Sequence, residues 1–227
     1  MRLDTNPNIE AVIFDLDGVI VDTAQYHYEA WKTLALEWNY SLKSSDNEAL
    51  KGVSRKDSVS KIAAWAGVQP SAQELENIAS RKNTLYLELC AELTPDDVLA
   101  GIENLINELK VNNIKVALGS ASKNARFVIE KLKLNNTFDV VVDGNDVLHS
   151  KPNPEVFLKA AERMNVQPQS CCVIEDAPAG LQAALKAQMI AVGLGKTSEL
   201  SQAHLILPNA TNLTLSKMKQ LYQQILS

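Results

Sequence analysis

The chain has 227 residues, enough for one large domain or for a core with a smaller companion domain. Its 46% hydrophobic and 22% charged residues are typical of a globular protein, and a net charge of −5 with a pI near 5.3 argues against a nucleic-acid binder. No apolar run approaches a membrane span and the polar N-terminus lacks a signal-peptide layout, so we expect a cytoplasmic protein without membrane partners, and also a monomer. The cysteines, Cys90, Cys171 and Cys172, lack metal-site spacing and are expected to be reduced, partly buried thiols.

The first predicted element is an apolar run at 11–16 (AVIFDL), which is rich in strand-forming residues and typical of a buried parallel strand. The interval from about Thr23 to Leu93 then holds no convincing strand. Long amphipathic patterns lie in this interval at 26–38, 58–65 and 73–90. They predict about four helices inserted directly after the first strand, with Trp38 and Trp65 in their core.

Beyond residue 95, strand-like runs alternate with helical patterns. The strand-like runs lie at 115–120, 139–143, 171–175, 189–194 and 204–207. Helical spacing of apolar residues lies at 102–110, 125–134, 154–164 and 179–187. The alternation predicts an α/β fold, a Rossmann-like parallel sheet with helices on both faces. We therefore expect a catalytic core of residues 1–22 and 95–227, with a helical cap domain at 23–94 joined by two short linkers suited to hinging.

Acidic residues follow the first predicted strand, where AVIFDLDGVI (11–20) places Asp15 and Asp17 before a glycine. Ligands bind at the carboxyl ends of the strands in open parallel sheets, so polar residues that end strands are expected to gather at one edge. The other candidates for this edge are Ser120, Lys151, Glu175 and Asp176. Clustered carboxylates repel one another, and hard oxygen ligands beside a phosphate-type substrate favour Mg²⁺.

The D-x-D-G pattern alone is weak, because it also occurs in turns and calcium loops, and a strand-ending turn explains it equally well. The ordered set is more specific: FDLDGV after a strand, SAS after the next, SKP on a loop and VIEDA after another strand. This set resembles the haloacid dehalogenase superfamily over nearly the whole chain, including the helical cap. The resemblance implies phosphoryl transfer through an aspartyl-phosphate.

A narrower resemblance is to the β-phosphoglucomutase family, carried by DLDGVIVDTAQYHYEAW, LKGVSRKDS, RKN, GSASKN, SKPNPEVF and IEDAPAG. It implies a sugar phosphate substrate and interconversion of β-D-glucose 1-phosphate and D-glucose 6-phosphate through β-glucose 1,6-bisphosphate. One alternative is a cap-bearing sugar-phosphate phosphatase with the same nucleophile, metal and acid. Another is a non-catalytic binding protein on the same fold. KGVSR with RKN and SASKN favours the mutase, and the complete set of acids and lysine argues against the binding protein.

The resemblance implies the catalytic roles. Asp15 is the nucleophile, and Asp17 is the general acid and base for the sugar hydroxyl. Ser120 and Lys151 hold the transferring phosphoryl group, and Lys151 neutralises charge in the transition state, although a solvated loop lysine is the plain alternative. The implied metal ligands are Asp15, the backbone carbonyl of Asp17, Glu175 and Asp176.

We assign the second, non-transferring phosphate to Ser122, Lys123 and Asn124, where helix N–H donors also favour an anion. Plain N-capping competes as an explanation for Ser122 and Asn124. Arg55 of the predicted cap suits bidentate phosphate recognition, against the alternative of an ordinary surface arginine.

The resemblance also places His27 and Lys82 of the cap near the carboxylate of the general acid, although a lone histidine on an apolar helix face is more often structural. Trp31 shares a helix face with His27, so it either lines the sugar or packs. The remaining substrate-binding candidates are Gly52, Ser58 and Ala121.

Overall fold

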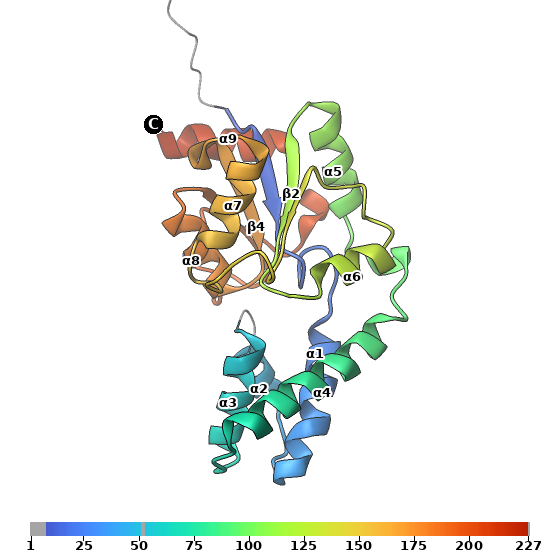
Figure 1. The fold of residues 1–227 in the computed structure, drawn as a ribbon. Helices are drawn as coiled ribbons and strands as arrows, with labels where there is room; N and C mark the ends of the chain where they lie inside the picture. The colour runs from blue at the N-terminus through green and yellow to red at the C-terminus, as the bar shows by residue number, and fades with distance from the viewer. Residues whose placement is uncertain (1–7, 51–52, 227) are drawn as a thin grey trace, which may run out of the picture.

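The structure, a computed structural model, describes residues 8–50 and 53–226. Its centre is a sheet of six parallel strands in the order β3-β2-β1-β4-β5-β6 (Figure 1). The strands are β1 (Ala11–Phe14), β2 (Lys115–Gly119), β3 (Val140–Val142), β4 (Cys171–Glu175), β5 (Ile190–Leu194) and β6 (Leu205–Leu207). Each strand lies within a run predicted from the sequence, and the α/β fold is confirmed.

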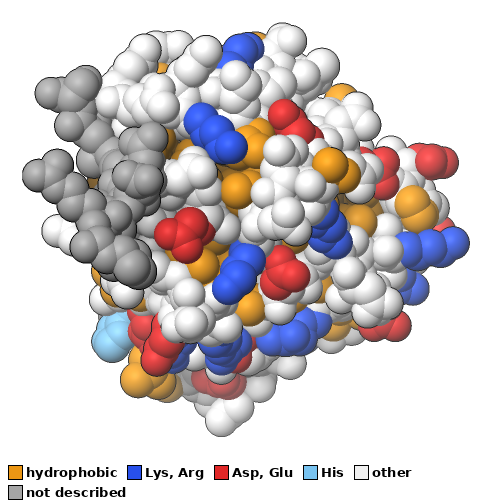
Figure 2. All heavy atoms as spheres, turned by 90° about the horizontal axis from the view of Figure 1, so that it is seen from above, with side chains coloured by type: hydrophobic (Ala, Val, Ile, Leu, Met, Phe, Trp, Pro, Cys, Tyr) orange, Lys and Arg blue, Asp and Glu red, His pale blue; other side chains and the backbone are white. Residues whose placement is uncertain are grey.

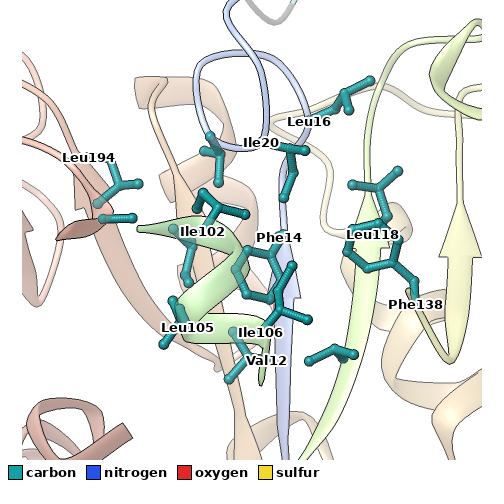
Figure 3. Packing of buried hydrophobic residues seen from close by; sticks show 14 of the residues in the cluster. Val12, Phe14, Leu16, Ile20, Ile102, Leu105, Ile106, Leu118, Phe138 and Leu194 are labelled. Atoms are coloured by element: carbon teal, nitrogen blue, oxygen red, sulfur yellow. The ribbon is translucent and has the colours of Figure 1, made fainter. Parts of the chain in front are cut away.

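Helices cover both faces of the sheet. One face carries α5 (Ile102–Val111), α6 (Ala125–Lys131) and α9 (Leu215–Leu226). The other carries α7 (Glu155–Met164) and α8 (Pro178–Lys186). Successive side chains of a strand point to opposite faces, so Val12 and Phe14 of β1 join the first layer while Ala11 and Ile13 join the second. Figure 3 shows Val12 and Phe14 against Ile102, Leu105 and Ile106 of α5.

The helix α9 has no counterpart among the elements expected from the sequence. Its residues Leu215, Met218, Leu221 and Tyr222 are buried against the first layer. Apolar residues at this spacing of three and four positions are typical of a helix, so the pattern could have predicted α9.

The inserted helices lie at the carboxyl ends of the strands, below the sheet in Figure 1. They are α1 (Ala24–Ala35), α2 (Ser44–Glu48), α3 (Arg55–Trp65) and α4 (Ala72–Cys90). Short 3₁₀ helices occupy Leu36–Trp38, Pro95–Asp97, Pro168–Ser170 and Ala210–Asn212. The insert has its own apolar cluster, which includes Trp31, Leu34, Val59 and Ile62. The helical cap is thus confirmed, while the boundaries at 22/23 and 94/95 stay a prediction.

The prediction that Trp65 belongs to the core of the cap is wrong. Trp65 is the last residue of α3 and is 37% exposed, with its ring centroid 6.4 Å from that of Tyr40. Trp38 is partly buried and packs against the apolar cluster of the cap. The helical spacing of Trp65 is right, but a residue at the end of a helix can leave the buried stripe because no further turn covers it.

On the side of the core opposite the cap, charges of both signs are mixed over the surface formed by the described residues (Figure 2). Figure 2 shows Lys and Arg side chains interspersed with Asp and Glu there, with apolar side chains in small separate areas. Within residues 8–50 and 53–226, no helix combines the length and apolar character that a membrane span needs. The three cysteines are free and fully buried, which is more burial than the sequence led us to expect.

Candidate active site

The strand register places the predicted acids side by side. Phe14 of β1 pairs with Leu118 of β2 and with Ile174 of β4, so the next residues, Asp15 and Glu175, are neighbours across the sheet edge. The backbone N–H of Asp15 donates to the carbonyl of Ile174 at 3.0 Å. The first residue beyond β1 is therefore held in the sheet ladder, which fixes where its carboxylate stands.

Lys151 bridges two of these carboxylates. Its Nζ lies 2.5 Å from Oδ1 of Asp15 and 2.6 Å from Oε1 of Glu175, and its side chain is only 3% exposed. Burial disfavours the ammonium, but the two neighbouring carboxylates outweigh this cost and raise the pKa of Lys151 above its ordinary value. Lys151 is therefore positively charged at neutral pH, and this charge at the strand tips suits contact with a phosphoryl group.

The acids fit a divalent cation. Carboxylate oxygens of Asp15, Glu175 and Asp176 lie within 4.8 Å of one another. One lysine facing three carboxylates leaves a net negative charge, and a set of hard oxygen donors suits such an ion. The neighbouring glycine makes room for them: Gly18 has φ +79°, and a Cβ there would lie 2.1 Å from Oδ2 of Asp176. This explains why the D-x-D pattern is followed by a glycine.

Asp17 has the environment of a proton carrier. Its Oδ1 accepts a hydrogen bond from the hydroxyl of Thr23. Burial and the nearby charge of Asp15 raise the pKa of Asp17 to about 6, against the opposing effects of Thr23, Lys151 and Lys82. A carboxyl group with a pKa close to neutral can both give and take a proton, which suits general acid and base catalysis.

The cap contributes a buried lysine beside a histidine. Lys82 is 2% exposed, and its Nζ lies 2.5 Å from Nδ1 of His27 and over the rings of Trp31 (5.0 Å) and Tyr86 (4.5 Å). Burial, with Arg55 nearby, lowers the pKa of Lys82 to about 7, and burial followed by the charge of Lys82 lowers the pKa of His27. When Lys82 is protonated its ammonium can only donate, and Nδ1 of a neutral His27 then accepts the hydrogen bond.

Tyr86 belongs to this group although the sequence reading did not select it. Its ring stacks on His27 with centroids 4.2 Å apart, and its position four residues after Lys82 on α4 is the signal that could have indicated a shared helix face.

The loop after β2 is tightly organised. Ser120 is buried, and its Oγ accepts from the backbone N–H of Ser122 at 3.0 Å, while the Oγ of Ser122 accepts from the N–H of Asn124 at 3.2 Å. The N–H of Gly144 donates to the carbonyl of Ser122 at 3.1 Å, and a Cβ at position 144 would lie 2.4 Å from the carbonyl oxygen of Ala121. Asn124 makes no side-chain capping bond to α6, so N-capping does not account for its side chain.

One cleft of about 870 Å³ between cap and core collects the candidates, and this volume is in the usual range for small-molecule sites. Its lining includes every described site residue that the sequence predicted: Asp15, Asp17, His27, Trp31, Arg55, Ser58, Lys82, Ser120, Ala121, Ser122, Lys123, Asn124, Lys151, Glu175 and Asp176. Gly52 lies outside the described residues.

The comparison with protein families identifies the family of the chain. The family model of the haloacid dehalogenase-like hydrolases matches residues 9–188. The chain belongs to this haloacid dehalogenase-like family. The family itself was expected from the ordered motifs, while the parallel sheet and the helical cap of this haloacid dehalogenase-like protein were expected from the alternation of strand-like and helical patterns.

Individual relatives within this family include β-phosphoglucomutases and a phosphatase. The chain is 39% identical to the β-phosphoglucomutase of Bacillus subtilis, over 95% of the chain and 96% of the relative. The crystal structure of β-phosphoglucomutase from Clostridium difficile superposes with a TM-score of 0.92 at 41% identity, covering 96% of this chain and 99% of the other. A phosphorylated carbohydrates phosphatase of Thermotoga maritima is 30% identical over 79% of this haloacid dehalogenase-like chain and 82% of the relative.

Proposed function

We propose that this enzyme is a phosphomutase that interconverts β-D-glucose 1-phosphate and D-glucose 6-phosphate through β-glucose 1,6-bisphosphate and a phosphoryl group on Asp15. The observation that carries the proposal is one cleft lined by two sets of residues whose side chains suit phosphate binding. The reactive set is Asp15, Ser120 and Lys151, and the distal set is Arg55, Ser122, Lys123 and Asn124. Two sets of similar character let one bisphosphate bind in either orientation, and the extensive similarity to β-phosphoglucomutases supplies the sugar.

In the proposed reaction the carboxylate of Asp15 attacks one phosphorus of β-glucose 1,6-bisphosphate, and the sugar oxygen leaves with a proton from Asp17, which releases glucose 6-phosphate. In the second step Asp17 takes the proton of the 6-hydroxyl of β-glucose 1-phosphate as that oxygen attacks the phosphoryl group on Asp15, which forms the bisphosphate again. Lys151 and Ser120 hold the phosphoryl oxygens while charge spreads over them. The raised pKa of Asp17 supports its role, because both protonation states are accessible near neutral pH.

We propose Mg²⁺ as the metal, held by Asp15, the backbone carbonyl of Asp17, Glu175 and Asp176. When bound, the ion neutralises carboxylate and phosphoryl charge. Removing the metal with a chelator is expected to lower turnover by about 100-fold or more, because phosphate and three carboxylates then repel one another. The measurement is glucose 6-phosphate formation in stripped enzyme and after titration with Mg²⁺, with chelator already saturated by Mg²⁺ as the control. Unchanged activity in the stripped enzyme would rule the metal out.

A phosphatase is the second candidate, favoured by the similarity to the Thermotoga maritima phosphatase. The nucleophile, the lysine and the acids serve both reactions, and the difference is whether a sugar hydroxyl or water receives the phosphoryl group. A phosphatase has no need of the distal set.

The decisive test uses both anomers of glucose 1-phosphate, with and without glucose 1,6-bisphosphate. We expect glucose 6-phosphate from the β anomer, stimulated by the bisphosphate, and little product from the α anomer. The measurement is glucose 6-phosphate and free phosphate in each reaction. Free phosphate as the main product throughout would replace the mutase proposal by the phosphatase.

A substitution of Arg55 tests the distal phosphate site independently of the reactive site. Arg55→Ala is expected to lower kcat/KM for the bisphosphate about 100-fold, because charge-assisted hydrogen bonds to the distal phosphate are lost. Hydrolysis of acetyl phosphate, which has no second phosphate, is expected to change little. Arg81→Ala is the matched control, since Arg81 lies on α4 of the same cap and pairs with Glu37. Equal loss on both substrates would mean that Arg55 supports the fold.

We further propose that the enzyme works as a monomer in the cytoplasm. The large apolar side chains exposed in the described chain come from different segments of the cap and the core, namely Leu36, Trp65, Val111, Leu148, Leu158 and Ile225, and single exposed apolar residues are common on monomers. The three free, buried cysteines suit a reducing compartment.

A further inference from the structure

A hydrogen bond joins the cap to the phosphate-binding loop of the core. The Nδ2 of Asn124, on the loop before α6, donates to Oδ1 of Asn83, on α4, at 2.7 Å. Both side chains are half-buried. Among the described residues that line the cleft is Asn124 but not Asn83, so the hydrogen bond to Asn124 is a direct link from Asn83 to a ligand there.

The chemistry of an amide gives this contact a consequence. A carboxamide nitrogen carries two N–H donors, and its oxygen only accepts. With one donor of Asn124 held by Asn83, the other stays available. While Asn83 keeps its orientation, the amide of Asn124 cannot turn over without placing its oxygen against the oxygen of Asn83. The backbone N–H of Asn124 is held separately, by the hydroxyl of Ser122 at 3.2 Å. Main chain and side chain of Asn124 are therefore both fixed before any ligand arrives.

The neighbour of Asn83 in the sequence makes the arrangement more specific. Lys82 points to His27 and the ring of Tyr86 in the cap, while Asn83 reaches the core. Of these two successive residues of α4, Lys82 thus contacts the cap and Asn83 contacts the core. Asn83 lies seven residues before Cys90, the last residue of α4, which corresponds to about 10 Å along the helix axis.

We propose that Asn83 is a positioning residue for the second, non-transferring phosphate. Its Oδ1 holds the amide of Asn124 in the orientation that offers an N–H donor to the anion, and it ties the phosphate-binding loop of the core to α4 of the cap. This inference rests on the proposed function, because it takes Asn124 to contact the distal phosphate.

The test is a double-mutant cycle in binding. All proteins carry Asp15→Asn, so that glucose 1,6-bisphosphate binds without transferring its phosphoryl group. The dissociation constant of the bisphosphate is measured by calorimetry for this parent, for added Asn83→Ala, for added Asn124→Ala and for both. We expect Asn83→Ala to weaken binding about tenfold, Asn124→Ala at least as much, and the double variant no more than Asn124→Ala alone.

Asn77→Ala is the matched control, because Asn77 is an exposed asparagine of the same helix whose amide oxygen accepts only from Gln73 in the contacts of the described chain. It is expected to leave the dissociation constant unchanged. With Asp15 intact, Asn83→Ala is expected to raise KM for the bisphosphate while kcat changes by less than about twofold, a split that a general loss of structure does not give.

Three results would overturn the proposal: a dissociation constant that Asn83→Ala leaves unchanged, effects of the two substitutions that multiply, or a parent that binds no bisphosphate. Failure of the mutase reaction is a separate outcome. It is recognised by free phosphate as the product of the unsubstituted enzyme, and the binding cycle still tests whether Asn83 acts through Asn124.

Discussion

Asp15→Ala is expected to lower turnover by about 10⁴-fold or more, because the substitution removes the group that receives the phosphoryl group. Asp15 is held at the tip of β1 by the hydrogen bond from its N–H to Ile174, and its carboxylate stands 2.5 Å from Nζ of Lys151. Glu175, at the end of β4, is the other described carboxylate that contacts Lys151 and belongs to the acidic cluster. Its carboxylate, however, also accepts hydrogen bonds from the backbone N–H groups of Asp176 and Ala177, both at 3.0 Å.

Two measurements check this expectation. Glucose 6-phosphate formation gives the loss of turnover, and intact-protein mass spectrometry after mixing with acetyl phosphate detects a phosphoryl adduct that Asp15→Ala must lack. A thermal melt controls for folding, because Lys151 keeps Glu175 as its partner in the variant. Turnover within about tenfold of the unsubstituted enzyme, or an adduct on Asp15→Ala, would move the nucleophile elsewhere.

The sheet was predictable because its signal is local. A strand buried on both faces reads as a short apolar run, and β1, β4 and β5 are fully buried runs of this kind. The acids that follow such runs were predictable for the same reason, since the carboxyl ends of parallel strands share one edge. The amphipathic patterns between Thr23 and Leu93 likewise predicted the cap, and the motif resemblance then added the roles of the site residues and the sugar.

What the sequence could not give are the contacts between distant segments. Asn83 and Asn124 are 41 positions apart, so no periodicity reports that they meet, and Lys82 and His27, 55 positions apart, were brought together only by the motif resemblance. The need for a glycine at position 144 arises from its close approach to the carbonyl oxygen of Ala121, which is known only once the loop is folded. The spacing of apolar residues also does not report that the last residue of a helix is exposed, which is why Trp65 was wrongly predicted to lie in the core of the cap.

The position of Asp17 bears on how a mutase protects its phosphoryl group from water. The second aspartate contacts Thr23, where the chain passes from the core into α1 of the cap, and the charge of the cap residue Lys82 acts on it. We expect that cap closure and the proton carrier are linked through these contacts, so that the acid and base acts when a sugar hydroxyl is in place.

Asp17→Asn is expected to lower mutase turnover by about 10³-fold, because the sugar oxygen then leaves without a proton and the incoming hydroxyl keeps its own. The substitution preserves the backbone carbonyl and nearly the same volume, so the loss reports on the proton. Phosphorylation of Asp15 by acetyl phosphate is expected to persist, since acetate is a good leaving group that needs no acid. Glucose 6-phosphate formation and the phosphoryl adduct, measured on the same preparation, separate the two steps.

Asp22→Asn is the matched control for Asp17→Asn, because Asp22 is an exposed carboxylate that lines the same cleft and accepts from the N–H of Ala24 at 3.0 Å, a bond that the amide oxygen can replace. It removes the same charge five residues away and is expected to leave turnover within about threefold. If both substitutions lower turnover equally, the negative charge of the cleft is what matters. If Asp17→Asn retains turnover, another group carries the proton. Loss of turnover in Asp17→Asn with the adduct still forming assigns the acid and base role to Asp17.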